Sequence, residues 1–117
     1  MCGILGGVGN EKLSKNFVDN HIDSLTSRGP DDKGKVSGGW GTFGHTRLSI
    51  LDLSEEGHQP MVSNCGQFII VYNGEIYNCN SLRNELMKKG HSFHSMTDTE
   101  VILEGFIRYK ENFIEKL

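Results

Sequence analysis

The hydrophobic positions in the first half of the chain predict a strand, a helix and a second strand. Residues 2–8 (CGILGGV) form a short apolar run, which predicts a buried strand weakened by glycine. Between residues 11 and 27 the apolar side chains recur every three or four positions, as on one face of a helix. Residues 40–51 (WGTFGHTRLSIL) predict one bent strand or two short ones. The intervening RGPDDKG, residues 28–34, has the composition of a turn, because proline fixes φ and aspartate bonds the local backbone.

The middle of the chain predicts a polar loop followed by a buried strand. Residues 52–65 are mostly polar and predict the loop. Residues 67–72 (QFIIVY) are apolar without alternation, which is typical of a strand that is buried on both faces. Asn73-Gly74 then predicts a tight turn, after which residues 75–77 (EIY) resume an extended segment.

Two helices are predicted in the last third of the chain. Residues 81–89 (SLRNELMKK) predict a helix that Asn80 caps and Gly90 ends. Residues 97–100 (TDTE) form a capping box, which begins a second helix that continues to Tyr109. Strands that are covered on both faces, with helices outside them, indicate an α+β domain in which sheet packs on sheet.

Length and charge narrow the class of protein. The 117 residues suit one domain. The net charge is −3 and the pI is about 5.9, with Lys and Arg scattered along the chain, so we expect no nucleic-acid partner. No apolar run approaches the roughly 20 residues that a membrane span requires, so we expect no membrane association. The N-terminus also lacks the pattern of a secretory signal.

The cysteines indicate a reducing compartment. There are three of them, Cys2, Cys65 and Cys79, and no C-x-x-C pair occurs. An odd number without such a pair argues against a disulfide framework, so we expect a cytoplasmic protein. The histidines do not pair with the cysteines at the spacing of zinc ligands, and no metal site is predicted.

The position of Cys2, directly behind Met1, suggests a specific chemistry. If Met1 is removed, Cys2 carries a thiol and a free α-amine on the same residue. An α-amine has a pKa of roughly 7.7–8.0, so a useful fraction is neutral at neutral pH. That amine can take the proton of the thiol, directly or through one water, which makes Cys2 a candidate N-terminal nucleophile.

Six motifs along the chain together resemble one known family. They follow in the order MCGI, RGPDDKG, GHTRLSILDLS, GHQPM, YNGEIYN and TDTEV, and they span residues 1–101. In this order they are similar to the glutaminase domain of the class II glutamine amidotransferases, and in particular to the asparagine synthetase branch. The resemblance implies an N-terminal-nucleophile (Ntn) hydrolase fold, an αββα sandwich that releases ammonia from glutamine.

The resemblance also implies the catalytic residues. Cys2 attacks the side-chain amide carbon of glutamine and forms a thioester, which water then hydrolyses. Asn73, through its side-chain amide, and Gly74, through its backbone N–H, form the oxyanion hole. His45 is expected to be structural, because the α-amine of Cys2 removes the need for a second base.

Three further residues are implied as the glutamine-binding set. Arg47 binds the α-carboxylate, and Glu75 and Asp98 hold the α-ammonium. Other roles stay open at these positions: Arg47 could pair with a surface carboxylate, and Asp98 could serve the helix dipole alone. Arg28 and Asp31 are expected to do no more than shape the RGPD turn.

Cofactors and partners follow from the same resemblance. The glutaminase half-reaction uses no metal or organic cofactor, whereas ATP and Mg²⁺ serve a C-terminal synthetase domain that receives the ammonia. We expect the sequence to hold a truncated glutaminase domain, without the last strands of its sandwich and without that synthetase domain. An uncovered sheet edge would then favour a homo-oligomer, another partner or marginal stability. Two alternatives stay open: a non-catalytic binding or assembly module, and an amidotransferase with a different acceptor.

Overall fold

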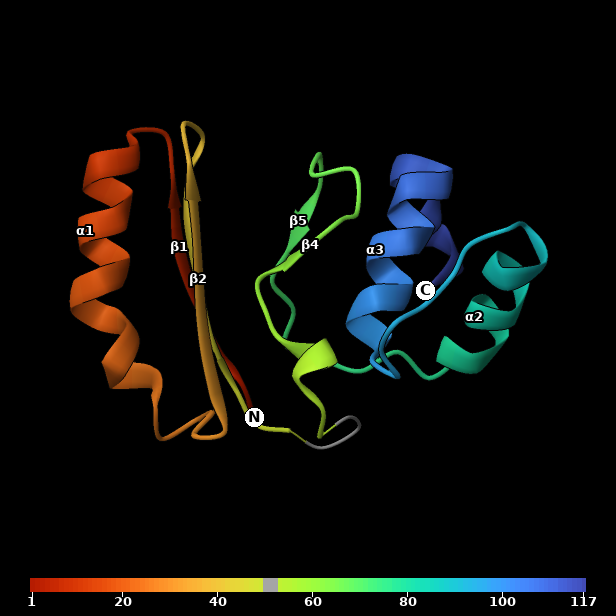
Figure 1. Ribbon diagram of the computed structural model, residues 1–117, viewed down its shortest axis with the longest axis horizontal. Helices are drawn as coiled ribbons and strands as arrows, with labels where there is room; N and C mark the ends of the chain where they lie inside the picture. Colours follow the sequence, from red (N-terminus) through yellow and green to blue (C-terminus); the bar gives the residue numbers. More distant parts are fainter. Residues whose placement is uncertain (50–52) are drawn as a thin grey trace. The chain divides into compact units, whose positions relative to one another are not determined.

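The computed structural model describes residues 1–49 and 53–117, which form two compact units (Figure 1). The first unit holds residues 1–49 together with His58–Pro60 and Val71–Asn73. The second unit holds the remaining described residues. Strands and helices occur in both units, which confirms a mixed α and β fold.

The first unit is built on a three-stranded antiparallel sheet. Its strands are β1 (Gly3–Val8), β2 (Asp32–Gly38) and β3 (Gly41–Arg47), and their order in the sheet is β1-β3-β2. The central strand β3 confirms most of the strand that was expected over residues 40–51. The register places Asp32 of β2 opposite Arg47 of β3. Residues 50–52, which end that expected strand and begin the predicted polar loop, lie outside the described residues.

One helix covers one face of this sheet (Figure 1). Helix α1 (Glu11–His21) begins at Asn10, whose side chain accepts a hydrogen bond from the backbone N–H of Leu13 at 3.0 Å. A 3₁₀ segment, η1 (Ile22–Leu25), continues it. The helix predicted between residues 11 and 27 is therefore confirmed, with its last turns wound more tightly than an α-helix.

The contact between helix and sheet depends on a glycine of β3. Val18 and Ile22 are buried, and they lie over Gly44. A Cβ atom added at Gly44 would stand 2.8 Å from Val18 Cγ1 and 3.1 Å from Ile22 Cδ1. Leu13 and Phe17, which follow the same helical spacing of apolar residues, are instead 69% and 47% exposed. Only some of the apolar side chains on the helical face of α1 and its continuation are therefore buried against the sheet.

Side chains along β3 alternate between the two faces of the sheet, so the residues that pack against α1 lie on one face and the candidate site residues lie on the other. Thr42 and Thr46 lie on the α1 side, where Thr42 Oγ1 contacts Ser14 Oγ at 3.3 Å and Thr46 Oγ1 donates to the carbonyl of Leu25 at 3.0 Å. Because successive side chains of a strand point to opposite faces, Phe43, His45 and Arg47 lie on the face that α1 does not cover.

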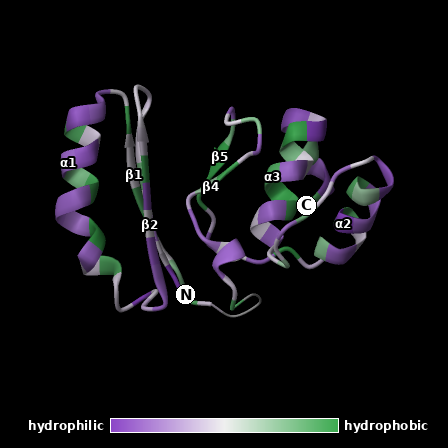
Figure 2. Cartoon of the chain, in the orientation of Figure 1, coloured by the Kyte–Doolittle hydropathy of each residue, from purple (hydrophilic) through white to green (hydrophobic). Residues whose placement is uncertain are grey.

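The second unit contains a two-stranded sheet, two α-helices and 3₁₀ segments. Its elements are η2 (Glu55–Gly57), β4 (Met61–Val62), β5 (Ile69–Ile70), α2 (Cys79–Lys88), α3 (Asp98–Tyr109) and η3 (Lys110–Lys116). Its core consists of Leu82, Leu86, Val101 and Phe113. Helix α3 is accordingly coloured more hydrophobic than α1 (Figure 2). No helix in the described part of the chain is both long and apolar enough to span a membrane.

Strand β2 was not predicted, because only Val36 among its seven residues has a large apolar side chain. Its polar and glycine residues were instead assigned to a turn over 28–34 and to the connection that follows. The expectation that β1 is buried throughout was also wrong, since Ile4 and Val8 are 41% and 80% exposed. Strand β1 alternates in burial, as a strand with one covered face does.

The strand expected over residues 67–72 is wrong in extent. Only β5 forms, its two residues are half-buried, and it pairs with β4 inside the predicted polar loop. The tight turn predicted at Asn73-Gly74 is also absent. Neither residue has the positive φ that a two-residue hairpin turn of this type needs, and only Gly74 bends the chain. The apolar run is therefore not a long strand, and only two of its residues take part in strand pairing.

Helix ends are predicted better by glycine and threonine than by asparagine. Helix α2 begins at Cys79 with Asn78 as its N-cap, so the predicted cap Asn80 lies inside the helix. Gly90 ends it as predicted, with φ of +93°. Helix α3 begins as predicted behind Thr97, whose side chain accepts from the backbone N–H of Glu100.

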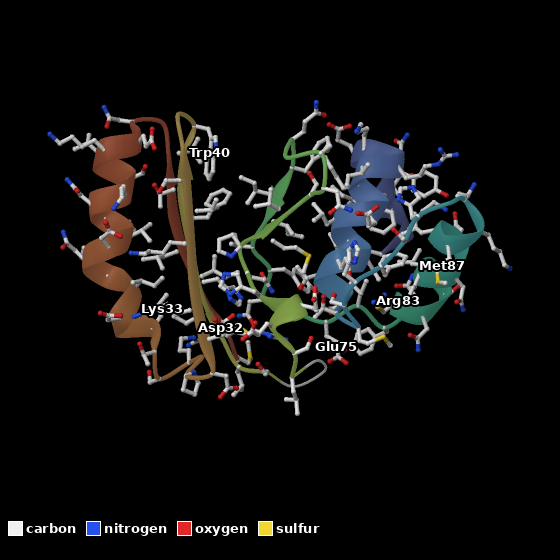
Figure 3. All side chains as sticks on the ribbon, viewed as in Figure 1. Asp32, Lys33, Trp40, Glu75, Arg83 and Met87 are labelled. Atoms are coloured by element: carbon white, nitrogen blue, oxygen red, sulfur yellow. The ribbon has the colours of Figure 1, made fainter. Side chains whose placement is uncertain are left out.

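Arg83 of α2 holds the loop that leads into α3 (Figure 3). Its Nη1 and Nη2 atoms donate to the carbonyls of Ser95 and Thr97, each at 2.9 Å. The Glu100 carboxylate accepts from the backbone N–H groups of His94 and Ser95 at 2.8 and 2.7 Å. All these bonds satisfy main-chain groups, so the loop is fixed by two charged side chains without an ordered strand.

We expect Arg83→Met to lower the free energy of unfolding by about 2–4 kcal/mol, because two charge-assisted hydrogen bonds are lost and two carbonyls lose a donor. Urea denaturation followed by circular dichroism measures the change. Arg108→Met, on the exposed side of α3, is the matched control and should stay within about 0.5 kcal/mol of wild type. Equal stabilities of the two variants would contradict the role of Arg83.

Candidate functional site

The candidate site residues fall into both units. Cys2, Arg47 and Asn73 belong to the first unit, and Gly74, Glu75 and Asp98 belong to the second.

The sulfur of Cys2 is held by the main chain at the end of β3. The backbone N–H of Leu48 donates to Cys2 Sγ at 3.3 Å, and the thiol lies 3.8 Å from the Leu48 carbonyl. Leu48 directly follows Arg47, the last residue of β3. The first unit therefore brings the candidate nucleophile next to the residue predicted to bind the substrate carboxylate.

The RGPD turn fixes the same strand end from its other side. Asp31 accepts a hydrogen bond from the backbone N–H of Ser49 at 2.8 Å, and its own N–H donates to the Arg47 carbonyl at 2.9 Å. Arg28 Nε lies 3.5 Å from the Cys2 carbonyl. The turn therefore contacts the main chain of both Cys2 and the segment that anchors its sulfur.

Gly29 allows this turn to approach β3 closely. A Cβ atom at this position would stand 2.3 Å from the carbonyl of Thr46 and 2.5 Å from the backbone nitrogen of Arg47. Real Cβ atoms do not approach a backbone that closely. The glycine of RGPD is therefore required by the packing of the turn against the strand.

Arg47 is buried, with 6% of its surface exposed. Its cross-strand partner Asp32 accepts a hydrogen bond from the backbone N–H of Lys33 at 2.8 Å (Figure 3). Asp32 also pairs with His58 Nδ1 at 2.6 Å. Asp32, Arg47 and His58 thus cluster at one end of the sheet.

Between Arg47 and Phe43 on the same face lies His45, which is completely buried. Burial lowers the pKa of His45 below its ordinary value near 6.5 and outweighs the hydrogen bond to the Tyr72 carbonyl, which raises it; the charge of Arg47 acts in the same direction as burial. Its Nε2 lies 3.3 Å from the carbonyl of Tyr72. The expectation that His45 is structural agrees with this environment.

Asn73 is the exposed residue that follows Tyr72. It lies outside any helix or strand, and its side-chain amide makes no hydrogen bond to the described part of the chain. An exposed amide without a protein partner is available to a ligand.

In the second unit, Asp98 is brought to the segment that contains Glu75. Asp98 Oδ2 accepts from the backbone N–H of Ile76 at 3.3 Å, and Asp98 is 6% exposed. Gly74 and Glu75 precede Ile76 and are exposed (Glu75 is labelled in Figure 3). Asp98 is also the first residue of α3, where a carboxylate favours the helix dipole. Both roles considered for Asp98 are therefore compatible with its position.

Arg28, Asp31 and Gln59 were not predicted to belong to the site, but they contact site residues or residues close to them in the sequence. Arg28 and Asp31 were expected only to shape their turn, and Gln59 was not singled out. The RGPD and GHQPM motifs contain them, so membership of a motif was the available indication. Across residues 1–49 and 53–117, no three His, Cys, Asp or Glu side chains are arranged to hold a metal ion.

Comparison with known proteins places these motifs in a family. A family model described as a glutamine amidotransferase domain matches residues 1–117. The chain is 41% identical over 126 residues to glutamine-hydrolyzing asparagine synthetase 3 of Bacillus subtilis (strain 168), which covers 100% of this chain and 20% of that protein. It is 35% identical over 120 residues to a glutamine-hydrolyzing asparagine synthetase of Brassica oleracea, again with 100% and 20% coverage.

A relative named for a different activity is also similar. The chain is 32% identical over 148 residues to glutamine–fructose-6-phosphate aminotransferase of Thermococcus kodakarensis, with 100% of this chain and 24% of that protein covered. The chain thus spans about a fifth to a quarter of the length of the curated relatives it matches.

Gly29→Ala should displace the RGPD turn from β3 and lower the free energy of unfolding by about 1–3 kcal/mol, as overpacking does. Gly39→Ala is the matched control, because nothing lies within 4 Å of its added Cβ and its φ is not in the left-handed region. Urea titration of both variants checks the difference. A Gly29→Ala protein as stable as Gly39→Ala would contradict the close packing.

Acid should destabilise the native chain in part through His45. Its pKa is lowered on folding, so as the pH falls through about 6.5 the unfolded chain binds a proton that the native chain does not. This contribution to stability is complete above that pH and declines below it, with a slope of at most about 1.4 kcal/mol per pH unit. Urea unfolding between pH 8 and pH 5 should show that the free energy of unfolding declines less for His45→Gln than for wild type. If the two proteins lose stability in parallel as the pH falls, this role of His45 is contradicted.

Proposed function

This chain belongs to the family of glutamine amidotransferase domains, and from that premise we propose that it hydrolyses the side-chain amide of L-glutamine to glutamate and ammonia, with Cys2 as the nucleophile. The observation that carries the proposal is the position of the Cys2 sulfur, 3.3 Å from the backbone nitrogen of Leu48, directly after Arg47. A nucleophile beside a cation that can bind a carboxylate suits an amino-acid substrate. We further propose that the domain is an αββα sandwich of the Ntn-hydrolase type.

The nucleophile requires removal of Met1. The released α-amine of Cys2 then accepts the thiol proton, and the sulfur attacks the amide carbon of glutamine. The tetrahedral intermediate collapses as the C–N bond breaks, and the amine returns the proton to the departing nitrogen, which leaves as ammonia. A water molecule, deprotonated by the same amine, attacks the thioester and releases glutamate. Atoms and protons balance over the cycle, and Cys2 is regenerated.

The developing oxyanion needs donors that are already in position. Asn73 offers an exposed side-chain amide, and Gly74 offers a backbone N–H at a bend. Donors of this kind contribute most when they are fixed before the reaction. Their adjacency in sequence allows one segment to supply both.

The amino-acid end of glutamine carries one positive and one negative charge. Arg47 is the cation proposed for the α-carboxylate, since a planar guanidinium matches a planar anion. Glu75 and Asp98 are proposed for the α-ammonium, and a hydrogen bond from the backbone N–H of Ile76, the residue after Glu75, joins that segment to Asp98. Substrate recognition would thus use side chains whose charges are complementary to both charged groups of the amino acid.

The destination of the ammonia is proposed from the relatives. Two of those described above are named glutamine-hydrolyzing asparagine synthetases, and this chain is less similar to the aminotransferase that acts on a sugar phosphate. We therefore propose that ammonia passes to a synthetase domain that uses ATP and Mg²⁺ to amidate aspartate. The glutaminase step itself uses no cofactor in this proposal.

Ammonia release from glutamine, measured together with the intact mass of the same sample, tests the function. A chain that lacks Met1 should release ammonia, and Cys2→Ser should slow release sharply because an alcohol is a poorer nucleophile at neutral pH. Cys65→Ser makes the same chemical change at an exposed position of the second unit and should leave release unchanged. Equal rates for Cys2→Ser and wild type would refute the proposal, as would no release from a chain whose mass shows that Met1 is gone.

A further inference from the structure

We propose that His45 and Gln59 are positioning residues for the oxyanion donor Asn73, because they bind both hydrogen-bonding groups of the Tyr72 main chain. This inference rests on the proposed function, in which Asn73 stabilises the tetrahedral intermediate. All four residues belong to the first unit, and the segment Val71–Asn73 is part of it although most of its sequence neighbours are not.

Two hydrogen bonds fix Tyr72. The backbone N–H of Tyr72 donates to Gln59 Oε1 at 2.6 Å, and the Tyr72 carbonyl lies 3.3 Å from His45 Nε2. That carbonyl belongs to the peptide that joins Tyr72 to Asn73. The His45 bond therefore acts on the peptide plane from which the Asn73 residue continues.

The residues that hold Tyr72 are buried, and the residue they present is exposed. His45 has no exposed surface and Gln59 has 6%. Tyr72 is half-buried, and Asn73 is exposed. Val71–Asn73 lies in no helix or strand, so no regular ladder orients it. The two side-chain bonds take the place of that ladder.

The protonation state of His45 suits this task. A carbonyl can only accept, so Nε2 must carry a hydrogen, and in the neutral ring Nδ1 is then the unprotonated nitrogen. Nδ1 is buried and has no hydrogen-bond partner in the described residues. The burial that lowers the pKa of His45 keeps this neutral form at physiological pH. One nitrogen is therefore used, and its partner is the Tyr72 main chain.

Gln59 is itself fixed to the sheet. Gly34 of β2 has no side chain, and a Cβ there would stand 2.1 Å from the Gln59 carbonyl and 2.6 Å from His58 Nε2. His58 is in turn bound to Asp32 of β2 at 2.6 Å. The Tyr72 main chain is thus connected to β2 through Gln59 and to β3 through His45.

The same sheet therefore positions three parts of the proposed chemistry. The end of β3 places Arg47 and, through Leu48, the sulfur of Cys2. His45, two residues before Arg47, places Asn73 through Tyr72. An oxyanion donor is effective only within a few tenths of an ångström of its place, and a shift of about 1 Å can cost about 10²-fold in rate.

The test compares side chains that remove a hydrogen bond with side chains that keep it. Gln59→Met removes the acceptor at similar volume, and Gln59→Glu keeps an accepting oxygen. His45→Met removes the donor, and His45→Gln keeps an N–H at a similar reach. Gln67→Met is the control for the chemical change, since Gln67 is exposed in the second unit. All variants are assayed for ammonia release after mass spectrometry shows loss of Met1.

The two removal variants should lower kcat by about 10- to 100-fold, whereas the two retaining variants should recover most of it. The Kd for L-glutamine, measured with each change on a Cys2→Ala background, should stay within about threefold of the parent. Gln67→Met should match wild type. Far-UV circular dichroism verifies that each variant is folded.

A double substitution separates positioning from general support of the fold. Asn73→Ala alone should lower kcat by about 10²–10³-fold. Because Gln59 acts through Asn73, adding Gln59→Met to Asn73→Ala should change kcat by less than about threefold further. If the decrease in kcat of the double variant equals the product of the two single decreases, the proposal is overturned. Weaker binding of glutamine with unchanged kcat in the removal variants would also overturn it, as would failure of both removal variants to fold.

The experiment also separates this inference from the proposed function. A wild-type chain that lacks Met1 and releases no ammonia, or an Asn73→Ala variant as fast as wild type, overturns the oxyanion role and the positioning role together. A slow Asn73→Ala variant beside unchanged Gln59→Met and His45→Met variants overturns only the positioning role.

Discussion

Strand β3 is hydrogen-bonded on both sides, to β1 and to β2, and the candidate residues of the first unit depend on this position. Because its side chains alternate, Gly44 faces α1 while His45 and Arg47 face away from it. A shift of one residue in register would exchange these faces. The packing of α1 over Gly44 therefore stabilises the fold and determines which residues are available for chemistry.

The sequence predicted correctly those helix ends that are stabilised by residues close by in the sequence. Thr97 caps α3 and Gly90 ends α2, and both follow from interactions within a few residues of the helix end. Strand β2 could not be found in this way, because it is stabilised by its ladder with β3 and contributes little apolar surface of its own. The run at 67–72 shows the opposite error, since an apolar segment without a long partner strand forms only the two residues of β5.

The residues of the candidate site also differ in how far the sequence alone could indicate them. Cys2 and Arg47 could be proposed as site residues from the sequence, because a motif specifies residue type and position, and their roles stay predictions. The roles of Asp31 and Gln59 could not, because each acts on a backbone group far along the chain. The sequence of a motif does not state which distant peptide its side chain will bind.

Main-chain anchoring in the first unit has a consequence for how the sequence can vary. The groups that hold the Cys2 sulfur, the Asp31 carboxylate and the Gln59 amide are backbone N–H groups of Leu48, Ser49 and Tyr72. Every amino acid except proline supplies that donor. These three anchors therefore constrain side-chain identity weakly and backbone conformation strongly, so a family can diverge at such positions and still preserve the geometry around its nucleophile, provided that proline never enters them.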